Sequence, residues 1–209
     1  VLEWDRYQQQ VAVAPEVDRR TKAGKEADAE FRAALADRPD AVIATVEQDA
    51  KARAMREAVM GHPSARALLE DGQAETTLLF ELLGVSGKAR PDWLPTGYPV
   101  IVDLKTAADA SPSEFARASA RYGYALQAAF YVDAAAQCGL PDLTFIHVVV
   151  ETEAPYGVAV YQMDDEAIDH GRRCYERALT TYRACRETGE WPGYAPEILH
   201  LSLPRWALS

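Results

Sequence analysis

Three residues, Asp92, Asp103 and Lys105, have the types and the spacing that metal-dependent hydrolysis of a phosphodiester requires. Asp103 follows the apolar run Val100-Ile-Val, and Lys105 stands two positions after it. Residues two apart on a strand point to the same face, so the carboxylate and the ammonium would lie side by side. Two acids can hold a divalent metal, and a lysine can sit beside the phosphate that the metal polarises. The pattern therefore predicts an enzyme that cuts nucleic acid.

A third carboxylate, Glu75, is a candidate to join the two aspartates. Glu75, Asp92 and Asp103 each lie near the end of a predicted strand, and neighbouring strands are about 4.8 Å apart. Three acids could therefore converge on a pair of cations, with Glu81 as the competitor for the role of Glu75. A solvated surface charge is the alternative for any single acid. That alternative is weak for Asp103, because a carboxylate on a buried strand is costly without a metal or a base.

The composition is that of one soluble globular domain. The chain has 209 residues, of which 48% are hydrophobic and 26% are charged, and this suffices for a sizeable core. No apolar run is long enough for a membrane span, and no signal peptide is visible. The three cysteines, Cys138, Cys174 and Cys185, have no metal-ligand spacing and favour a reducing compartment. We therefore expect a cytoplasmic protein that does not act at a membrane.

The formal net charge of −10 argues against a protein whose entire surface wraps nucleic acid. It leaves room for a local basic groove behind an acidic outer surface. Four clusters could supply this groove: Arg19, Arg20, Lys22 and Lys25; Lys51, Arg53 and Arg56; Lys88 and Arg90; Arg117 and Arg121. For any one of these clusters, a solvated face is the alternative.

Periodicity and end signals predict an α/β (α+β) core, a central mixed sheet flanked by helices. Thr45 and Gln48 have the spacing of a capping box at a helix start. Strands over 75–83, 87–94 and 98–105 have short connections and predict an antiparallel meander. The last of the three should be central, because it is apolar on both faces. Further strands are expected over 143–151 and 157–163, and helices over 22–36, 45–60, 64–69, from 111, 124–138 and 164–188.

At Pro91-Asp92 and Asp103-Leu104-Lys105 the sequence resembles the PD-(D/E)xK nuclease superfamily. The closer resemblance is to the nuclease domain of RecE-type exonucleases, the exodeoxyribonuclease VIII of prophages, and it covers nearly the whole chain. It implies a restriction-endonuclease-like core and a single nuclease domain over 1–209. Further matching segments are Ala14-Pro15-Glu16, Arg19-Arg20-Thr21, Gly24-Lys25-Glu26, Ala74-Glu75, Tyr124 with Gln127 and Tyr131, Glu190-Trp191-Pro192, and Leu201-Ser202-Leu203-Pro204-Arg205-Trp206-Ala207.

The resemblance implies a role for each residue of the acidic segment. Asp92 and Asp103 would ligate Mg²⁺, with Mn²⁺ as a substitute, helped by the backbone carbonyl of Leu104. Lys105 would position or activate the attacking water and offset charge in the transition state. Glu75 would be an outer ligand or a ligand of a second metal.

The resemblance also implies that one helix lines the site. Gln127 and Tyr131 are four apart and so share a helix face, and Tyr124 lies one turn before Gln127. Core packing is the alternative for the two tyrosines.

One feature of the family has no counterpart in the chain. RecE-type enzymes carry a metal-ligating His a few residues before a Leu-Glu pair, and the matching pair here is Leu2-Glu3. Because the chain opens without an initiator Met, we interpret it as a C-terminal fragment of a longer protein. The family's His then either lies upstream of Val1 or is absent. The four histidines present, His62, His147, His170 and His200, do not stand at the family position and are interpreted as structural or exposed.

The function implied by the resemblance is a Mg²⁺-dependent, processive 5′→3′ exonuclease on linear double-stranded DNA. It would leave 3′ single-stranded tails for a RecT-type annealing protein, as part of recombination. A toroidal homo-oligomer, a trimer or tetramer, would enclose the DNA. Arg90 and the cluster Arg19, Arg20, Lys22 and Lys25 would contact the DNA. Two alternatives remain: a DNA-binding or assembly module that has lost cleavage, and an endonuclease of the same superfamily.

Overall fold

The centre of the molecule is a five-stranded sheet in which the strand of Asp103 and Lys105 is the middle one. The computed structural model describes residues 2–195 and 197–205. Trp206 and Ala207 of the C-terminal matching segment lie outside the described residues. The elements, in chain order, are α1 (Trp4–Gln10), β1 (Val11–Val13), α2 (Lys22–Ala34), β2 (Val42–Ala44), α3 (Val46–Gly61), α4 (Pro63–Leu69), β3 (Gly72–Ala74), β4 (Leu78–Leu82), β5 (Val85–Ala89), β6 (Trp93–Pro95), β7 (Val100–Ala107), α5 (Pro112–Tyr122), α6 (Tyr124–Gln137), β8 (Thr144–Glu151), β9 (Val158–Gln162) and α7 (Asp165–Thr188).

The strand order of the central sheet is β3-β6-β7-β8-β9, and the sheet is mixed. Strand β7 runs parallel to β8 and antiparallel to β6, while β8 and β9 are antiparallel. The residues from Val100 to Asp103 are all buried, as expected for a strand covered on both faces. The predicted mixed sheet and the central place of this strand are therefore confirmed.

Helices cover the two faces of this sheet, and alternation along β7 assigns each residue to one face. Val102 packs on one side with Val148 and with residues of α3 and α4 such as Val59 and Leu68. Ile101 packs on the other side with Phe145 and with three buried alanines of α6. Asp103 and Lys105 follow Ile101 by two and four residues, so their side chains point to the same face of the sheet as Ile101, toward α6.

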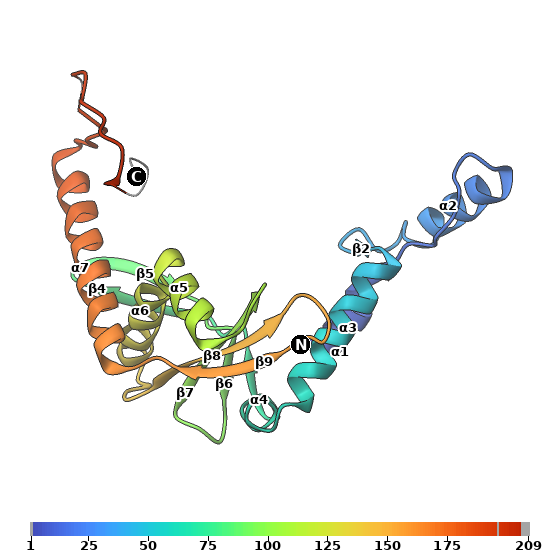
Figure 1. The fold of residues 1–209 in the computed structure, drawn as a ribbon, viewed down its shortest axis with the longest axis horizontal. Helices are drawn as coiled ribbons and strands as arrows, with labels where there is room; N and C mark the ends of the chain where they lie inside the picture. The colour runs from blue at the N-terminus through green and yellow to red at the C-terminus, as the bar shows by residue number, and fades with distance from the viewer. Residues whose placement is uncertain (1, 196, 206–209) are drawn as a thin grey trace.

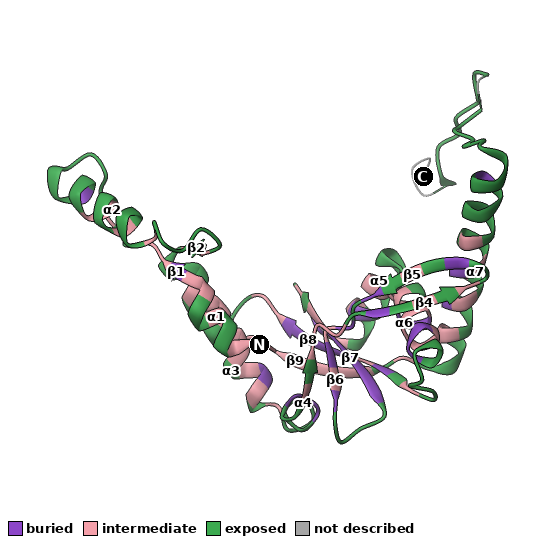
Figure 2. Ribbon diagram, turned by 180° about the vertical axis from the view of Figure 1, so that it is seen from behind, coloured by how far each residue is buried: buried purple, intermediate pink, exposed green. Residues whose placement is uncertain are grey.

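Two parts of the chain project away from the sheet. Helices α1, α2 and α3 with the parallel pair β1–β2 form an arm on one side, and α2 lies at its far end (Figure 1). Helix α7 and the residues that follow it project on the other side. Figure 2 shows the buried residues gathered on the central sheet, whereas α2 is largely exposed. None of the helices in the described part of the chain is long and apolar enough to cross a membrane.

The predicted three-stranded meander is wrong, because its first strand lies outside the central sheet and its second strand is divided between two sheets. The chain turns at Glu75, whose φ of 54° is left-handed, so β3 ends there and β4 begins afresh. The predicted strand 75–83 therefore contains only β4, whereas the segment 87–94 is shared between β5 and β6. Strands β4 and β5 pair only with each other, as an antiparallel hairpin outside the central sheet. Leu78 and Ala89 of this hairpin are buried against α6, and this packing separates it from β3 and β6.

Most of the helix starts and ends that the sequence predicts are confirmed. Both hydrogen bonds of the Thr45–Gln48 capping box are present at the start of α3. Helix α2 starts as expected and ends at Ala34, two residues early. His62 does more than end a helix, because its Nδ1 also accepts the Ala65 N–H at 3.3 Å and so caps α4. Helix α1 has no counterpart among the predicted elements.

Candidate active site

Asp103 and Lys105 form an ion pair on the α6 face of β7. The Nζ of Lys105 lies 2.6 Å from Oδ2 of Asp103, and the Asp103 side chain is only 1% exposed. The period of two along a strand puts both side chains on one face, as the sequence indicates. A buried carboxylate requires compensation, and the lysine supplies part of it.

Helix α6 supplies a glutamine that joins these two groups. Gln127 donates through Nε2 to Oδ1 of Asp103 at 3.0 Å and accepts at Oε1 from Nζ of Lys105 at 3.1 Å. The ring of Tyr124, one turn earlier, lies 4.7 Å from Nζ of Lys105, a distance at which a cation interacts with an aromatic face. The structure thus brings Gln127 and Tyr124 to the predicted site.

Asp92 reaches the same place from the connection between β5 and β6. Its Oδ2 accepts the backbone N–H of Leu104 at 2.9 Å, and its backbone carbonyl accepts the N–H of Glu75 at 3.1 Å. Burial raises the pKa of Asp92, and the charges of Asp103 and Glu75 raise it further against the lowering effects of the Leu104 N–H and Lys105. Negative charge is therefore crowded around Asp92.

Glu75 and Arg90 complete this side of the site. Oε2 of Glu75 lies 2.6 Å from Nε of Arg90, and both residues line a cavity of about 530 Å³ together with Asp92 and Leu104. Helix α1 and the preceding Leu2 and Glu3 form the opposite wall of the cavity. The competitor Glu81 lies exposed on the separate β4–β5 hairpin, so Glu75 is the better placed acid.

The other predicted site residues do not lie beside Asp92, Asp103 and Lys105. Arg19, Arg20, Lys22 and Lys25 lie on α2 and just before it, at the far end of the arm (Figure 1). Three of them form ion pairs with nearby acids, Arg19 with Asp28, Arg20 with Asp18 and Lys22 with Glu26. Tyr131 packs in the core against Phe145, with ring centroids 6.3 Å apart. The roles implied for these residues stay predictions.

His147 is a site residue that the sequence interpretation missed. The parallel register of β7 and β8 pairs it with Asp103, and its Nδ1 lies 3.3 Å from Oδ2 of Asp103. An ionised carboxylate can only accept, so Nδ1 must carry the hydrogen. His147 is 1% exposed. In the sequence, His147 could have been recognised as a site residue because it is the lone polar residue in the apolar run Phe145-Ile-His-Val-Val-Val.

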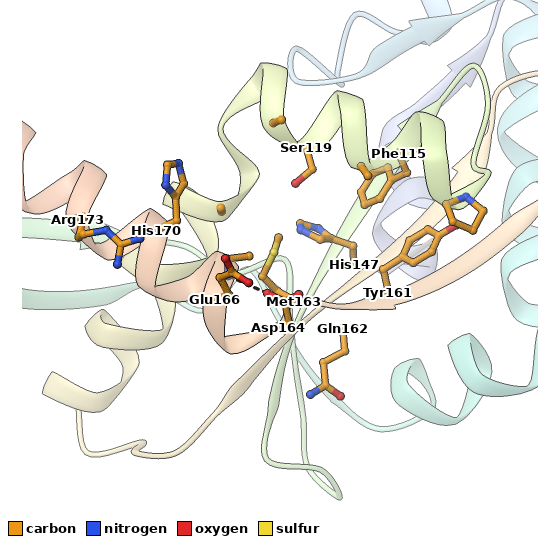
Figure 3. A pocket seen from close by; sticks show the side chains of 15 residues that line it. Phe115, Ser119, His147, Tyr161, Gln162, Met163, Asp164, Glu166, His170 and Arg173 are labelled. Carbon is orange, nitrogen blue, oxygen red and sulfur yellow. Dashed lines mark hydrogen bonds between the residues drawn. The ribbon is translucent and has the colours of Figure 1, made fainter.

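The other nitrogen of His147, Nε2, is buried and has no hydrogen-bond partner among the described residues. His147 borders a cavity of about 610 Å³ between α5, β9 and the start of α7. Figure 3 shows its ring among Phe115, Ser119, Met163 and Tyr161. His147 therefore stands between the carboxylate of Asp103 and a second cavity.

The donor set around Asp92 and Asp103 fits a hard divalent cation. Nowhere in 2–195 or 197–205 do three or more His, Cys, Asp or Glu side chains form a group that could hold a metal ion. Magnesium is commonly held by only one or two carboxylates, with waters and substrate phosphate oxygens completing its shell. Burial and the charge of Asp103 raise the pKa of Asp92, and a cation would offset both effects. Asp92, Asp103 and the carbonyl of Leu104 are the groups that would hold it.

Comparison with known proteins finds a matching family model and a similar solved structure. A family model described as "PDDEXK-like domain of unknown function (DUF3799)" matches residues 7–202. The chain is also similar in fold to the crystal structure of a "Putative exonuclease" from Eubacterium rectale, with a TM-score of 0.61 and 14% sequence identity over 88% of this chain and 74% of that one. No curated protein matches the sequence. The family match and the fold agree with the mixed sheet and its acidic cluster.

Proposed function

The chain belongs to the family of PDDEXK-like domains of unknown function, and from that premise we propose that it is a metal-dependent nuclease acting on DNA. One observation carries the proposal. The two carboxylates and the lysine of the family's namesake pattern converge, since Asp103 pairs with Lys105 at 2.6 Å and Asp92 accepts the N–H of Leu104 between them. The fold shared with the Eubacterium rectale protein supports the same conclusion.

Each residue has a distinct part in such a reaction. A divalent metal, when bound, would polarise the phosphate and lower the pKa of its water. Lys105 places a positive charge next to the metal-binding carboxylates, where charge grows on the phosphoryl oxygens. Gln127 and Tyr124 hold Lys105 on two sides, so that its ammonium keeps one orientation. Arg90, exposed beside Glu75, can contact a neighbouring phosphate.

The finer proposal is a RecE-type exonuclease. It would use Mg²⁺, or Mn²⁺ in its place, and digest one strand of linear double-stranded DNA in the 5′→3′ direction. The 3′ tail would pass to a RecT-type annealing protein. The support for this proposal is the set of matching segments along the chain, including Leu2-Glu3, whose residues line the cavity beside Asp92. A toroidal homo-oligomer would make digestion processive.

A second candidate is a DNA-binding or assembly module that has lost cleavage. One observation favours it: both oxygens of Asp103 are engaged by the protein, Oδ1 by Gln127 and Oδ2 by Lys105 and His147. A metal would have to compete with these contacts. Calorimetric titration of the protein with Mg²⁺ and Mn²⁺ separates the candidates, because the module would bind neither ion at Asp92 and Asp103.

Digestion of end-labelled DNA tests the proposal. The wild-type protein should degrade linear duplex in the presence of Mg²⁺ and leave closed circular duplex intact, and the position of the label should show the polarity. Asp103→Asn should abolish digestion while its circular dichroism spectrum shows that it is folded, and Asp37→Asn, an exposed aspartate on the arm, should digest normally. Cleavage of the closed circle would instead indicate an endonuclease. Retained digestion by Asp103→Asn would remove Asp103 from the reaction.

A further inference from the structure

Two tyrosines at the junction of α5 and α6 connect Lys105 to the surface. The Nζ of Lys105 lies 4.7 Å from the centroid of the Tyr124 ring. The Tyr124 ring stacks on that of Tyr122, with centroids 5.9 Å apart and planes 29° apart. The guanidinium of Arg121 lies 5.5 Å from the Tyr122 centroid. Lys105, Tyr124 and Tyr122 thus form a row that leads outward from the site, and Arg121 lies beside its outer ring.

The stacking of the two tyrosines depends on the residue between them. Gly123 has φ 70° and ends α5, while α6 begins at the next residue. This left-handed conformation suits glycine, because a side chain there would be strained even where space is free. At this junction the rings of residues two apart in the chain stack on each other. The row is therefore a product of the helix junction.

The outer end of the row is open to solvent. Tyr122 is 62% exposed, whereas Tyr124 is half-buried against Phe115 and His147. Arg121, Tyr122 and Tyr124 line a groove of about 450 Å³ that reaches Thr106, the neighbour of Lys105. An exposed aromatic surface with a cation beside it thus leads away from the catalytic lysine.

The charges along this groove leave one guanidinium available. Arg117 also lines it, but Arg117 pairs with Glu114. The other acid there, Asp109, accepts the backbone N–H of Ser111 at 2.7 Å. Arg121, by contrast, has no ion-pair partner within the described part of the chain; its contact is with the Tyr122 ring.

We propose that Tyr122 is a stacking platform for a base of single-stranded DNA, and that Arg121 binds a phosphate of the same strand. The inference rests on the proposed action on DNA, and it adds a route along which an unpaired DNA strand would lie on the protein. Proteins that bind single strands without sequence preference combine aromatic platforms with a basic groove, because every base offers a π-face. Bases inside a duplex are already stacked, so Tyr122 would take bases only from an unpaired strand, next to Lys105.

Binding measured without cleavage tests this directly. In EDTA, the fluorescence anisotropy of a labelled oligothymidine should report a loss of affinity of about 5- to 150-fold for Tyr122→Ala, the range that one stacked base contributes. Tyr122→Trp should bind as tightly as the wild-type protein. Tyr98→Ala, which removes another exposed tyrosine, is the matched control and should also bind normally. An oligonucleotide with abasic sites should bind the wild-type protein and Tyr122→Ala alike.

Arg121→Ala provides a second, independent variant. It should weaken the binding of oligothymidine and of the abasic strand equally, and it should reduce the salt slope by about one unit, as expected when one phosphate is no longer bound. Equal affinity of the wild-type protein and Tyr122→Ala for oligothymidine would overturn the inference. So would an equal reduction on the abasic strand, because the ring would then not bind a base.

The same assays distinguish failure of this inference from failure of the proposed function. If the wild-type protein digests no DNA but its binding still depends on Tyr122, the nuclease function is wrong and the stacking platform stands. Normal digestion with binding that does not depend on Tyr122 would overturn the platform alone.

Discussion

Nδ1 of His147 lies 3.3 Å from Oδ2 of Asp103, although the two residues are 44 positions apart in the chain. The same oxygen accepts from Nζ of Lys105 at 2.6 Å. His147 therefore holds the carboxylate from the neighbouring strand β8, and it restricts which way Asp103 can turn. Groups that orient a metal ligand in this way commonly affect metal affinity or activity by about 10- to 100-fold.

Replacing His147 by Phe should lower kcat by about tenfold or more and change KM little, because the hydrogen bond to Asp103 is removed while the ring still packs against Phe115 and Phe145. Steady-state digestion of linear duplex measures both constants. His147→Asn, whose amide can donate where Nδ1 does, should restore much of the activity. A merely structural role for His147 predicts instead that both variants lose stability and that kcat is unchanged.

Replacing Asp92 by Asn should stabilise the protein in the absence of metal. Burial and the charge of Asp103 disfavour the ionised Asp92, and Asn removes the charge while it can still accept the N–H of Leu104. Thermal unfolding in EDTA at neutral pH should therefore give a higher midpoint for the variant. Added Mg²⁺ should raise the midpoint of the wild-type protein and leave that of Asp92→Asn unchanged. A lower midpoint in EDTA would contradict the charge crowding described for the site.

Reversing the charges of Arg19 and Arg20 to Glu should weaken DNA binding if the arm contacts DNA. The slope of log affinity against log salt should fall in magnitude by about two units, roughly one for each phosphate that is no longer bound. Anisotropy titrations of duplex DNA over a range of salt concentrations give this slope. Arg66→Glu on α4, also an exposed arginine paired with an acid, is the control. An unchanged slope would mean that the arm does not bind DNA and that Arg19 and Arg20 of the wild-type protein pair only with the acids of the arm.

The packing of α7 on α6 should depend on pH through Asp133. Burial favours the neutral carboxyl, but hydrogen bonds from Arg172 and Tyr175 outweigh burial and hold the pKa of Asp133 below its usual value. A lowered pKa means that this contribution to stability is present above the usual aspartate pKa of 3.8 and disappears as pH falls below it through the folded-state pKa.

Asp133→Asn should cost about 2 kcal/mol at neutral pH, the scale of hydrogen bonds to a charged group. The difference from the wild-type protein should shrink in acid. Urea unfolding from neutral pH down to about pH 3, below the reference pKa of an aspartate, measures it, with Asp169→Asn as the control for the exposed partner of Arg172. A difference that does not depend on pH would show that charge on Asp133 is not the cause.

Local patterns in the sequence determined several features by themselves. The shared face of Asp103 and Lys105 follows from the period of two along a strand, and the start of α3 follows from the Thr45–Gln48 capping box. The buried middle strand follows from Val100-Ile-Val. These features need only residues close in the chain, so they can be predicted without knowing how the chain folds back on itself.

The tertiary structure decided which distant groups meet Asp103. The parallel pairing of β7 with β8 requires a crossover through α5 and α6, and only the resulting register puts His147 beside the carboxylate. The packing of α6 on the sheet sets the contact of Gln127, and the turn at Glu75 decides which sheet each short strand joins. Such pairings depend on burial and packing over the whole domain, because a local pattern specifies a face of an element but leaves its partner open.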